Sequence, residues 1–192
     1  MTARFMPSAV VLSGLFVLFA PTLRTQNQNQ NQTAARHVEV VAISPRAEDV
    51  SSIDDIMKAF YEVISGPAGE ARQWSRDRTL YVPGVRFVSM GVNVKGEPVA
   101  HVVDHQQFVD STDTDLTAKG FFEWEIHRET KRFGNIAHIF SAYESRITKG
   151  GPVIARGVNS VELFWDGKRW WIAGAIWDEE RKDNPLPKDF LN

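Results

Sequence analysis

The stretch VNSVELFWDGKRWWIAGAIW, residues 158 to 177, is the part of the sequence that most restricts the fold. It contains two alternating runs joined by Asp166-Gly167, a pair typical of a two-residue β-hairpin turn. Such a turn predicts that Leu163 lies opposite Trp170. Because successive side chains of a strand point to opposite sides, the register also assigns every other residue of the hairpin to one of two faces.

Both faces of this predicted hairpin are apolar. One face carries Val161, Leu163, Trp170, Ile172 and Ile176. The other carries Val158, Phe164, Trp171 and Trp177, together with Ser160 and Glu162. An antiparallel sheet needs only one apolar face, so the second requires a cover. A second copy of the chain is the simplest cover, and Phe164, Trp171 and Trp177 are therefore predicted to form the face of a homodimer.

The rest of the pattern predicts helices first and long strands afterwards. Apolar residues at helical spacing predict a helix over 53–64, capped by Ser51 and Ser52. Shorter helices are expected over 69–80 and 102–109, and strands over 85–94, 116–130 and 135–148. Helices gathered on one face of a sheet define an α+β fold. We therefore predict a strongly bent antiparallel sheet wrapped on N-terminal helices.

The N-terminal region has the pattern of an export signal. An apolar run from Ala9 to Ala20 follows Arg4, and it is shorter than the roughly 20 residues of a membrane span. Residues 1–25 are predicted to be a secretory signal peptide, with an uncleaved membrane anchor as the alternative. Residues 26–49 are expected to be a flexible Gln/Asn-rich tether, 50–183 one folded domain, and 184–192 a C-terminal tail.

Charge and cysteine content narrow the possible partners. The formal net charge is −2, from 22 basic and 24 acidic residues, and it becomes −4 without residues 1–25, which hold Arg4, Arg24 and no acid. An acidic domain without a run of basic residues is a poor binder of nucleic acid. No membrane association is expected once the signal is cleaved. The chain has no cysteine, so its stability depends on its apolar core and not on disulfides.

Three stretches together resemble a known superfamily. They are IDDIMKAFYEVISGPAGEARQWSRDRTLYVPGVRFV, FFEWEIHRETKRFGNIAHIFSAYESRI and VNSVELFWDGKRWWIAGAIWDEE. Their order resembles the nuclear transport factor 2-like superfamily and, within it, the SnoaL-like and ketosteroid-isomerase-like proteins with a cystatin-like α+β fold. The resemblance implies a cone-shaped sheet with one open pocket, and dimers that form through the outer sheet face. Members include isomerases, dehydratases, epoxide hydrolases and cyclases, so the fold does not fix a reaction.

The strand FFEWEIHRET contains the most suggestive cluster of titratable residues. Glu123, Glu125 and His127 alternate with Phe122, Trp124 and Ile126. Side chains on one face of a strand lie about 6.5–7 Å apart, too far for three in succession to bind one metal at about 2.0–2.3 Å. We therefore predict no metal site. We interpret the acidic face as a solvated outer face and expect the apolar face to point inward; acid–base catalysis is the alternative.

His138 is the better candidate for catalysis, because it lies between apolar residues of a predicted strand. If it faces the pocket, it can act as an acid or base near neutral pH. The alternative is a hydrogen-bonded core histidine. His101, Asp104 and His105 are further candidates for the mouth of the pocket. No Gly-rich phosphate loop and no Ser nucleophile motif is present, and no cofactor is expected.

The predicted pocket has an apolar wall with polar tips. The expected lining residues are Tyr61, Trp74, Tyr81, Trp124 and Asn159. For Tyr61, Trp74 and Tyr81 the alternative is packing in the core, and for Asn159 it is a structural hydrogen bond. The leading hypothesis is an exported domain that binds a small, mostly apolar organic molecule. A cofactor-free lyase or isomerase that uses His138, and a non-catalytic dimeric interaction module, are the alternatives.

Overall fold

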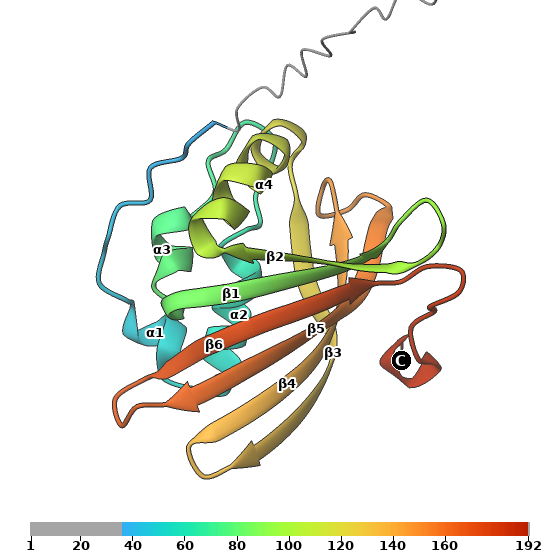
Figure 1. Cartoon of the computed structure of the whole chain (residues 1–192). Helices are drawn as coiled ribbons and strands as arrows, with labels where there is room; N and C mark the ends of the chain where they lie inside the picture. The colour runs from blue at the N-terminus through green and yellow to red at the C-terminus, as the bar shows by residue number, and fades with distance from the viewer. Residues whose placement is uncertain (1–35, 192) are drawn as a thin grey trace, which may run out of the picture. The chain divides into compact units, whose positions relative to one another are not determined.

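The computed structural model describes residues 36–191 (Figure 1). Its helices are α1 (Ala47–Val50), α2 (Ile53–Glu62), α3 (Trp74–Arg78), α4 (His105–Lys119) and the short 3-10 helix η1 (Lys188–Leu191). Its strands are β1 (Tyr81–Val92), β2 (Pro98–Asp104), β3 (Phe122–Phe133), β4 (Ile136–Arg146), β5 (Val153–Trp165) and β6 (Trp170–Glu179). The predicted α+β class is confirmed.

The strands form one curved sheet in the order β2-β1-β6-β5-β4-β3 (Figure 1). All neighbouring strands are antiparallel except β1 and β6, which are parallel. The edge strands β2 and β3 do not pair with each other, so the sheet of residues 36–191 stays open. The sequence predicted an antiparallel sheet and missed the one parallel pair, because that pair joins strands far apart in the chain.

Helix α2 forms where its capping residues predict it. The Ser52 hydroxyl accepts a hydrogen bond from the backbone N–H of Asp55 at 3.0 Å, which satisfies one of the free donors at the helix start. Asp54 and Asp55 in the first turn add favourable charge there. One face of the helix is buried, through Ile56, Met57, Ala59 and Tyr61. That face packs on the inner face of the sheet and forms part of the core.

Helix α4 begins and ends later than the sequence predicts. Residues 98–104 form strand β2, and the helix then runs to Lys119, so the predicted strand over 116–130 begins only at Phe122. A capping box fixes the start, because the Asp104 carboxylate accepts from the N–H of Gln107 while the Gln107 side chain accepts from the N–H of Asp104. This reciprocal pair explains why the helix begins at His105.

Helix α3 is shorter than predicted because a buried arginine organises the chain before it. Arg72 is 5% exposed and donates to the carbonyls of Gly66, Pro67, Glu70 and Leu116. These bonds fold residues 66–72 as a loop against the end of α4 instead of as a helix. Only residues 74–78 remain helical.

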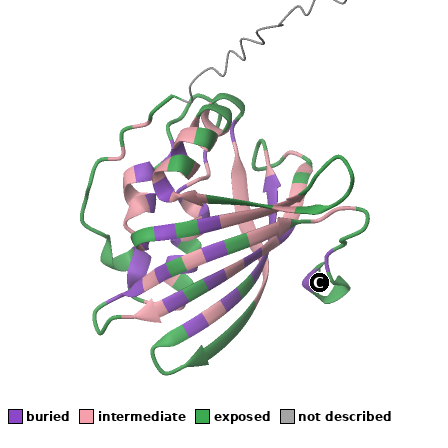
Figure 2. Ribbon diagram, viewed as in Figure 1, coloured by how far each residue is buried: buried purple, intermediate pink, exposed green. Residues whose placement is uncertain are grey.

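The β5–β6 turn has four residues, Asp166–Arg169, and not the two that the sequence predicts. Leu163 therefore pairs with Ile172 instead of Trp170. The cause is the Asp166 carboxylate, which accepts hydrogen bonds from two backbone N–H groups inside the turn at 2.8 and 2.9 Å. A register shift of two residues leaves the faces unchanged near the turn. Figure 2 shows the resulting alternation of buried and exposed positions along the strands.

Some residues that the sequence assigns to the tether, 26–49, already contact the folded domain. The Asp110 carboxylate of α4 bonds with the His37 ring at 3.1 Å and with the Val38 N–H at 2.9 Å. Asp49 is buried in an ion pair with Arg76 at 2.6 Å. The predicted signal peptide over 1–25 and the first part of the tether lie outside the described residues.

The C-terminal residues pack on the outer face of the sheet. The Phe190 ring of η1 is 4% exposed and stacks on the His127 ring, with the ring centres 4.5 Å apart. Its edge contact with Phe140 spans 6.0 Å. Residues of the predicted tail 184–192 therefore cover part of the outer face.

Replacing Phe190 with Ala should lower the free energy of unfolding by about 1.5–3 kcal/mol, the range for burial of a phenylalanine side chain. The loss arises because the contacts with His127 and Phe140 disappear. Leu191→Ala is the matched control, since Leu191 is 49% exposed. Urea unfolding of the two variants measures the difference. Equal effects would show that η1 does not contribute stability through Phe190.

Candidate binding pocket

A pocket lies between the inner face of the sheet and helices α2 and α4. Its volume is about 360 Å³. Small-molecule sites typically have volumes of about 300–1,000 Å³, so the space suits a small organic ligand. Much of its lining is an aromatic wall, formed by Phe60, Tyr81, Phe87, Phe108, Phe121 and Trp177.

The rings of the aromatic wall contact one another in series. Trp177 meets Phe108 edge to face at 6.0 Å between ring centres, Phe108 meets Phe87 at 5.4 Å, and Phe87 meets Tyr81 at 4.9 Å. Edge-to-face pairs are favoured because the positive ring edge lies on the negative ring face. The wall is therefore held by its own contacts and provides a preformed apolar surface.

Trp177 lies in the pocket and not on the predicted dimer face. Leu163 pairs with Ile172 and Glu162 pairs with Gly174, so Ala173 is an extra residue without a partner in β5. Such a β-bulge reverses which residues of the strand point inward. Ala175 is consequently 2% exposed, whereas Ile176, expected on the buried face, is 48% exposed. The prediction for Trp177 is wrong because the sequence pattern does not reveal the bulge.

Strand β3 also contains a bulge, and its two faces differ from the predicted ones. Glu123 faces the pocket and Trp124 faces away from it, the opposite of the predicted arrangement. The Arg146 guanidinium lies 5.2 Å from the Trp124 ring centre, so the outward tryptophan is covered by a cation. Ile126 has no partner in β4, and this bulge returns His127 to the outer face. The sequence predicted the outward position of His127 correctly and those of Glu123 and Glu125 wrongly.

Glu123 carries the most perturbed carboxyl group in the pocket. Burial, and to a smaller extent the like charge of Glu179, raises its pKa from 4.5 to about 8. Within residues 36–191, no side chain forms a hydrogen bond or ion pair with this carboxyl group. It is therefore largely protonated at neutral pH and can donate a hydrogen bond or a proton into the pocket.

Sequence analysis missed several polar residues beside Glu123. Tyr143 and Ser145 on β4 and Glu179 at the end of β6 line the same pocket. Burial and the charges of Glu123 and Glu179 raise the pKa of Tyr143 far above its usual value. The pairing Glu123–Ser145 places two of these groups directly opposite each other. Alternation along β4 could have placed Tyr143 and Ser145 on one face, but it could not show which face is inside.

Asn159 lines the pocket and anchors a hydrogen-bond chain that leads away from it. Its side-chain N–H donates to the Tyr61 hydroxyl at 3.1 Å, and Tyr61 lies 2.6 Å from the Ser141 hydroxyl. Ser141 donates to Glu125, which also forms an ion pair with Arg128 at 2.8 Å. Tyr61 is 4% exposed in the core and is not among the residues that line the pocket. Burial raises its pKa well above the ordinary value.

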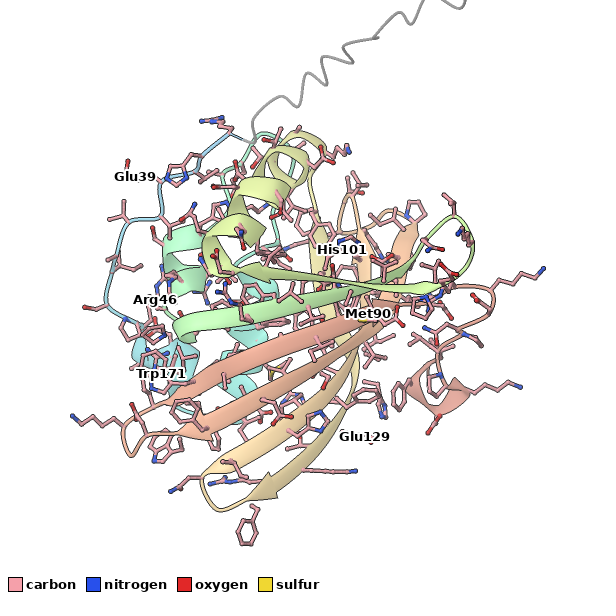
Figure 3. All side chains as sticks on the ribbon, in the orientation of Figure 1. Glu39, Arg46, Met90, His101, Glu129 and Trp171 are labelled. Atoms are coloured by element: carbon pink, nitrogen blue, oxygen red, sulfur yellow. The ribbon has the colours of Figure 1, made fainter. Side chains whose placement is uncertain are left out.

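Tyr81 lines the pocket with its ring, while its hydroxyl points away and donates to buried Asp77 at 3.0 Å. The same carboxylate bonds with the His105 ring at 2.8 Å, so His105 belongs to the core and not to the mouth of the pocket. His101 is exposed on β2 (Figure 3). Trp74 is buried beside the pocket, where its indole N–H donates to Asp113 at 2.6 Å.

His138 lies on the outer face of the sheet, so the structure does not bring it to the pocket. Its ring is 2.9 Å from the Ser160 hydroxyl and 4.0 Å from the Glu162 carboxylate, both on the outer face of β5. The side chain is 36% exposed. The sequence could not place it, because the face of β4 depends on the β3–β4 turn. The acid–base role predicted for His138 therefore has no support from the pocket geometry.

Phe164 and Trp171 lie opposite each other on the outer face, near the β5–β6 turn. Figure 3 labels Trp171. The Trp171 indole N–H donates to Asp166 at 2.7 Å, and the Arg169 guanidinium lies 3.7 Å from the ring centre. The same ladder continues through Ile136 and Phe133, which are 60% and 85% exposed. Together Phe133, Ile136, Phe164 and Trp171 form the outer apolar row.

The described part of the chain holds neither a metal-binding cluster nor a membrane-spanning helix. In residues 36–191, no group of three or more His, Cys, Asp or Glu side chains is placed to hold a metal ion. No helix in the same range is long and apolar enough to span a membrane.

No family model and no curated protein matches the sequence. Solved structures do match the fold. A protein of unknown function with a cystatin-like fold from Nostoc punctiforme has a TM-score of 0.52 and 6% identity, over 73% of this chain and 97% of its own. A protein assigned as the β subunit of an aromatic-ring-hydroxylating dioxygenase from Novosphingobium aromaticivorans has a TM-score of 0.52 and 13% identity, over 68% and 88%.

A nuclear transport factor 2-like protein of unknown function from Shewanella baltica is also similar, with a TM-score of 0.43 and 11% identity over 68% of this chain and 92% of its own. At these identities the comparisons establish the fold alone. The chain has a cystatin-like fold, as the resemblance in its sequence predicted.

Replacing Glu123 with Gln should make stability less dependent on pH. Between pH 4.5 and about 8 the unfolded chain loses the Glu123 proton while the folded chain keeps it. Rising pH therefore favours unfolding across this window, and the amide removes that contribution. The variant should gain in melting temperature over the wild type as pH rises from 5 to 8.

Glu129→Gln is the matched control, because Glu129 is exposed on the same strand (Figure 3). Its melting curve should follow that of the wild type at every pH. If Glu123→Gln also parallels the wild type, Glu123 does not hold its proton in the folded protein.

Proposed function

We propose that the protein is an exported domain that binds a small, mostly apolar organic molecule in its pocket. The observation that carries this proposal is the preformed pocket of about 360 Å³ behind the aromatic wall. Aromatic and aliphatic walls with a few polar groups are typical of small-molecule sites. The apolar run from Ala9 to Ala20 supports export.

The pocket supports binding more strongly than a named reaction. Its candidate for acid–base chemistry is Glu123, whose pKa of about 8 suits proton transfer near neutral pH. A reaction also needs a group that stabilises the charge formed on the substrate. Tyr143 and Ser145 offer hydroxyl groups near Glu123, but no cationic side chain among the described residues lines the pocket to stabilise such a charge. Binding is therefore the function that the geometry supports best.

Leu116→Trp should weaken ligand binding because Leu116 of α4 lines the pocket and a larger ring would occupy it. The probe is the neutral apolar dye Nile red, whose fluorescence rises when it leaves water. We expect the dissociation constant for the dye to rise by about tenfold, as when a ligand loses roughly 1.4 kcal/mol of contacts.

Thr114→Trp is the control, because Thr114 is on the same helix but exposed. It should leave dye binding unchanged. If the two variants bind the dye equally, or if the wild type does not bind it, the pocket is not the binding site.

We further propose a homodimer through the outer apolar row. Four side chains in one cross-strand ladder, Phe133, Ile136, Phe164 and Trp171, would be covered by the second copy. Trp177, which the sequence assigned to this face, takes no part because it lies in the pocket. Covering apolar surface that is otherwise exposed to water would favour association.

Ile136→Asp should disrupt this dimer, because a charge would be buried against apolar side chains in the centre of the row. We expect the dissociation constant of the dimer to rise at least about tenfold, measured by light scattering over a concentration series. Val94→Asp, at a fully exposed position of the β1–β2 turn, is the control. A wild-type protein that is monomeric at high concentration would refute the dimer.

A further inference from the structure

The polar groups of the pocket lack partners in the described part of the chain. Tyr143, Ser145 and Asn159 are 4%, 2% and 4% exposed, respectively. Within residues 36–191, the Tyr143 and Ser145 hydroxyl groups and the carboxyl groups of Glu123 and Glu179 form no hydrogen bond with another side chain or with the backbone. The Asn159 amide N–H donates to Tyr61, while its carbonyl oxygen forms no hydrogen bond in that range. These groups line the pocket, so their free hydrogen-bonding capacity is available to a ligand there.

The strand register explains how these groups come together. Tyr143 pairs with Gly157, and Gly157 pairs with Glu179. A Cβ atom at Gly157 would lie 2.6 Å from the Tyr143 hydroxyl and 2.5 Å from the Asp178 carbonyl oxygen. Only glycine leaves the room that lets the Tyr143 side chain lie over β5. Its hydroxyl can therefore reach the space between Glu123 and Glu179.

The unpartnered groups are chiefly acceptors, and two of them, Glu123 and Glu179, are carboxyl groups. No lysine, arginine or histidine is among the described residues that line the pocket. The Thr112 hydroxyl is already used as a donor to the Phe108 carbonyl at 2.7 Å. What remains is two carboxyl groups, the Asn159 carbonyl oxygen, and the Tyr143 and Ser145 hydroxyl groups, which can also accept hydrogen bonds. An ionised carboxylate in an apolar pocket is unfavourable unless a cation is paired with it.

The aromatic wall fits the same partner. The faces of tryptophan, tyrosine and phenylalanine rings attract organic cations. Trp177 and Glu179 are two residues apart on β6 and both line the pocket, so a carboxylate and an aromatic ring lie side by side. A cation there would meet opposite charge on one side and π-faces on the other.

We propose that the ligand of this pocket carries a positively charged amine, which is held between Glu123 and Glu179 while its apolar part lies along the aromatic wall. This inference rests on the proposed function and names the chemical class of the ligand. An ammonium group offers only hydrogen-bond donors, which complements a set of unpartnered acceptors. A ligand with a carboxylate would meet like charge and is excluded from the site.

Binding of the cation should depend on pH through Glu123. Its pKa near 8 means that the empty pocket holds a proton there at neutral pH. The other charged or titratable groups near Glu123 are Glu125 on its own strand, Tyr61 of α2, Tyr143 of β4, Glu179 of β6, and Glu62, Glu70, Arg76 and Lys149 along the adjoining groove. Both tyrosines stay neutral below pH 9 because burial raises their pKa values. A bound cation favours the ionised carboxylate, so affinity rises from pH 6.5 to 8.5.

The test uses the full chain and three probes with one skeleton: 4-phenylbutylamine, 4-phenylbutanol and 4-phenylbutyrate. Displacement of Nile red at pH 8 reports their affinities. We expect the amine to bind at least about tenfold more tightly than the alcohol, since one ion pair in an apolar pocket contributes roughly 1.4 kcal/mol or more. The carboxylate should bind more weakly than the alcohol.

Two variants assign the effect to the carboxyl groups. Glu123→Gln and Glu179→Gln should each weaken binding of the amine by about tenfold and leave binding of the alcohol unchanged. Glu179 is exposed at the rim of the pocket, so its replacement tests the proposal even if Glu123→Gln impairs folding. Glu129→Gln on the outer face of β3 is the control and should change neither.

The outcomes separate this inference from the proposed function. If the dye and the alcohol bind but the amine binds no more tightly than the alcohol, the ligand class is wrong and the apolar pocket stands. If both Gln variants prefer the amine over the alcohol as strongly as the wild type does, the carboxyl groups are not its partners and the inference is overturned. If neither the dye nor any probe binds, the proposed function fails together with the inference.

Discussion

One unpaired residue in each of two strands determines which side chains reach the pocket. Ile126 in β3 and Ala173 in β6 have no partner in the neighbouring strand, and each reverses the alternation beyond it. Without these bulges, the alternation would continue unbroken from the turn along each strand. Glu123 and Trp177 would then lie on the outer face. Bulges bend strands as well as shift them, so the same two positions contribute to the curvature of the sheet. Curvature and pocket chemistry thus have a common cause.

Buried charge is distributed unequally over the inner face. Glu125, one alternation further along β3 than Glu123, has an ion pair with Arg128 and a hydrogen bond from Ser141. Glu123 faces the pocket with none of these partners. Desolvation of a carboxylate is tolerated where such bonds compensate it, and otherwise the group keeps its proton. Two glutamates on the same face of one strand therefore differ in their surroundings: Glu125 is paired toward the core, and Glu123 faces the pocket without a side-chain partner among residues 36–191.

The sequence predicted the fold better than the site, for a physical reason. Periodicity and capping residues specify elements locally, so α2, the two hairpins and the α+β class could be predicted. The faces of β3 and β6 depend on bulges that leave no mark in the alternation. Trp124 illustrates the error: it was expected inside because it is apolar, yet its ring is covered on the outer side by Arg146. Glu123 was expected outside because it is charged, yet it lies on the inner face and lines the pocket.

Gly157 leaves room in β5 for the polar end of a neighbouring side chain, because it has no side chain of its own. A side chain at this position of β5 would fill the inner face, as Val161 and Leu163 do nearer the turn. Its absence leaves space for Tyr143 and brings three ionisable groups from three strands to one place. Among the described residues, this arrangement concentrates hydrogen-bond acceptors at one side of the pocket. The amine ligand that we propose would supply hydrogen-bond donors to these acceptors, and Gly157 is the position that makes room for them.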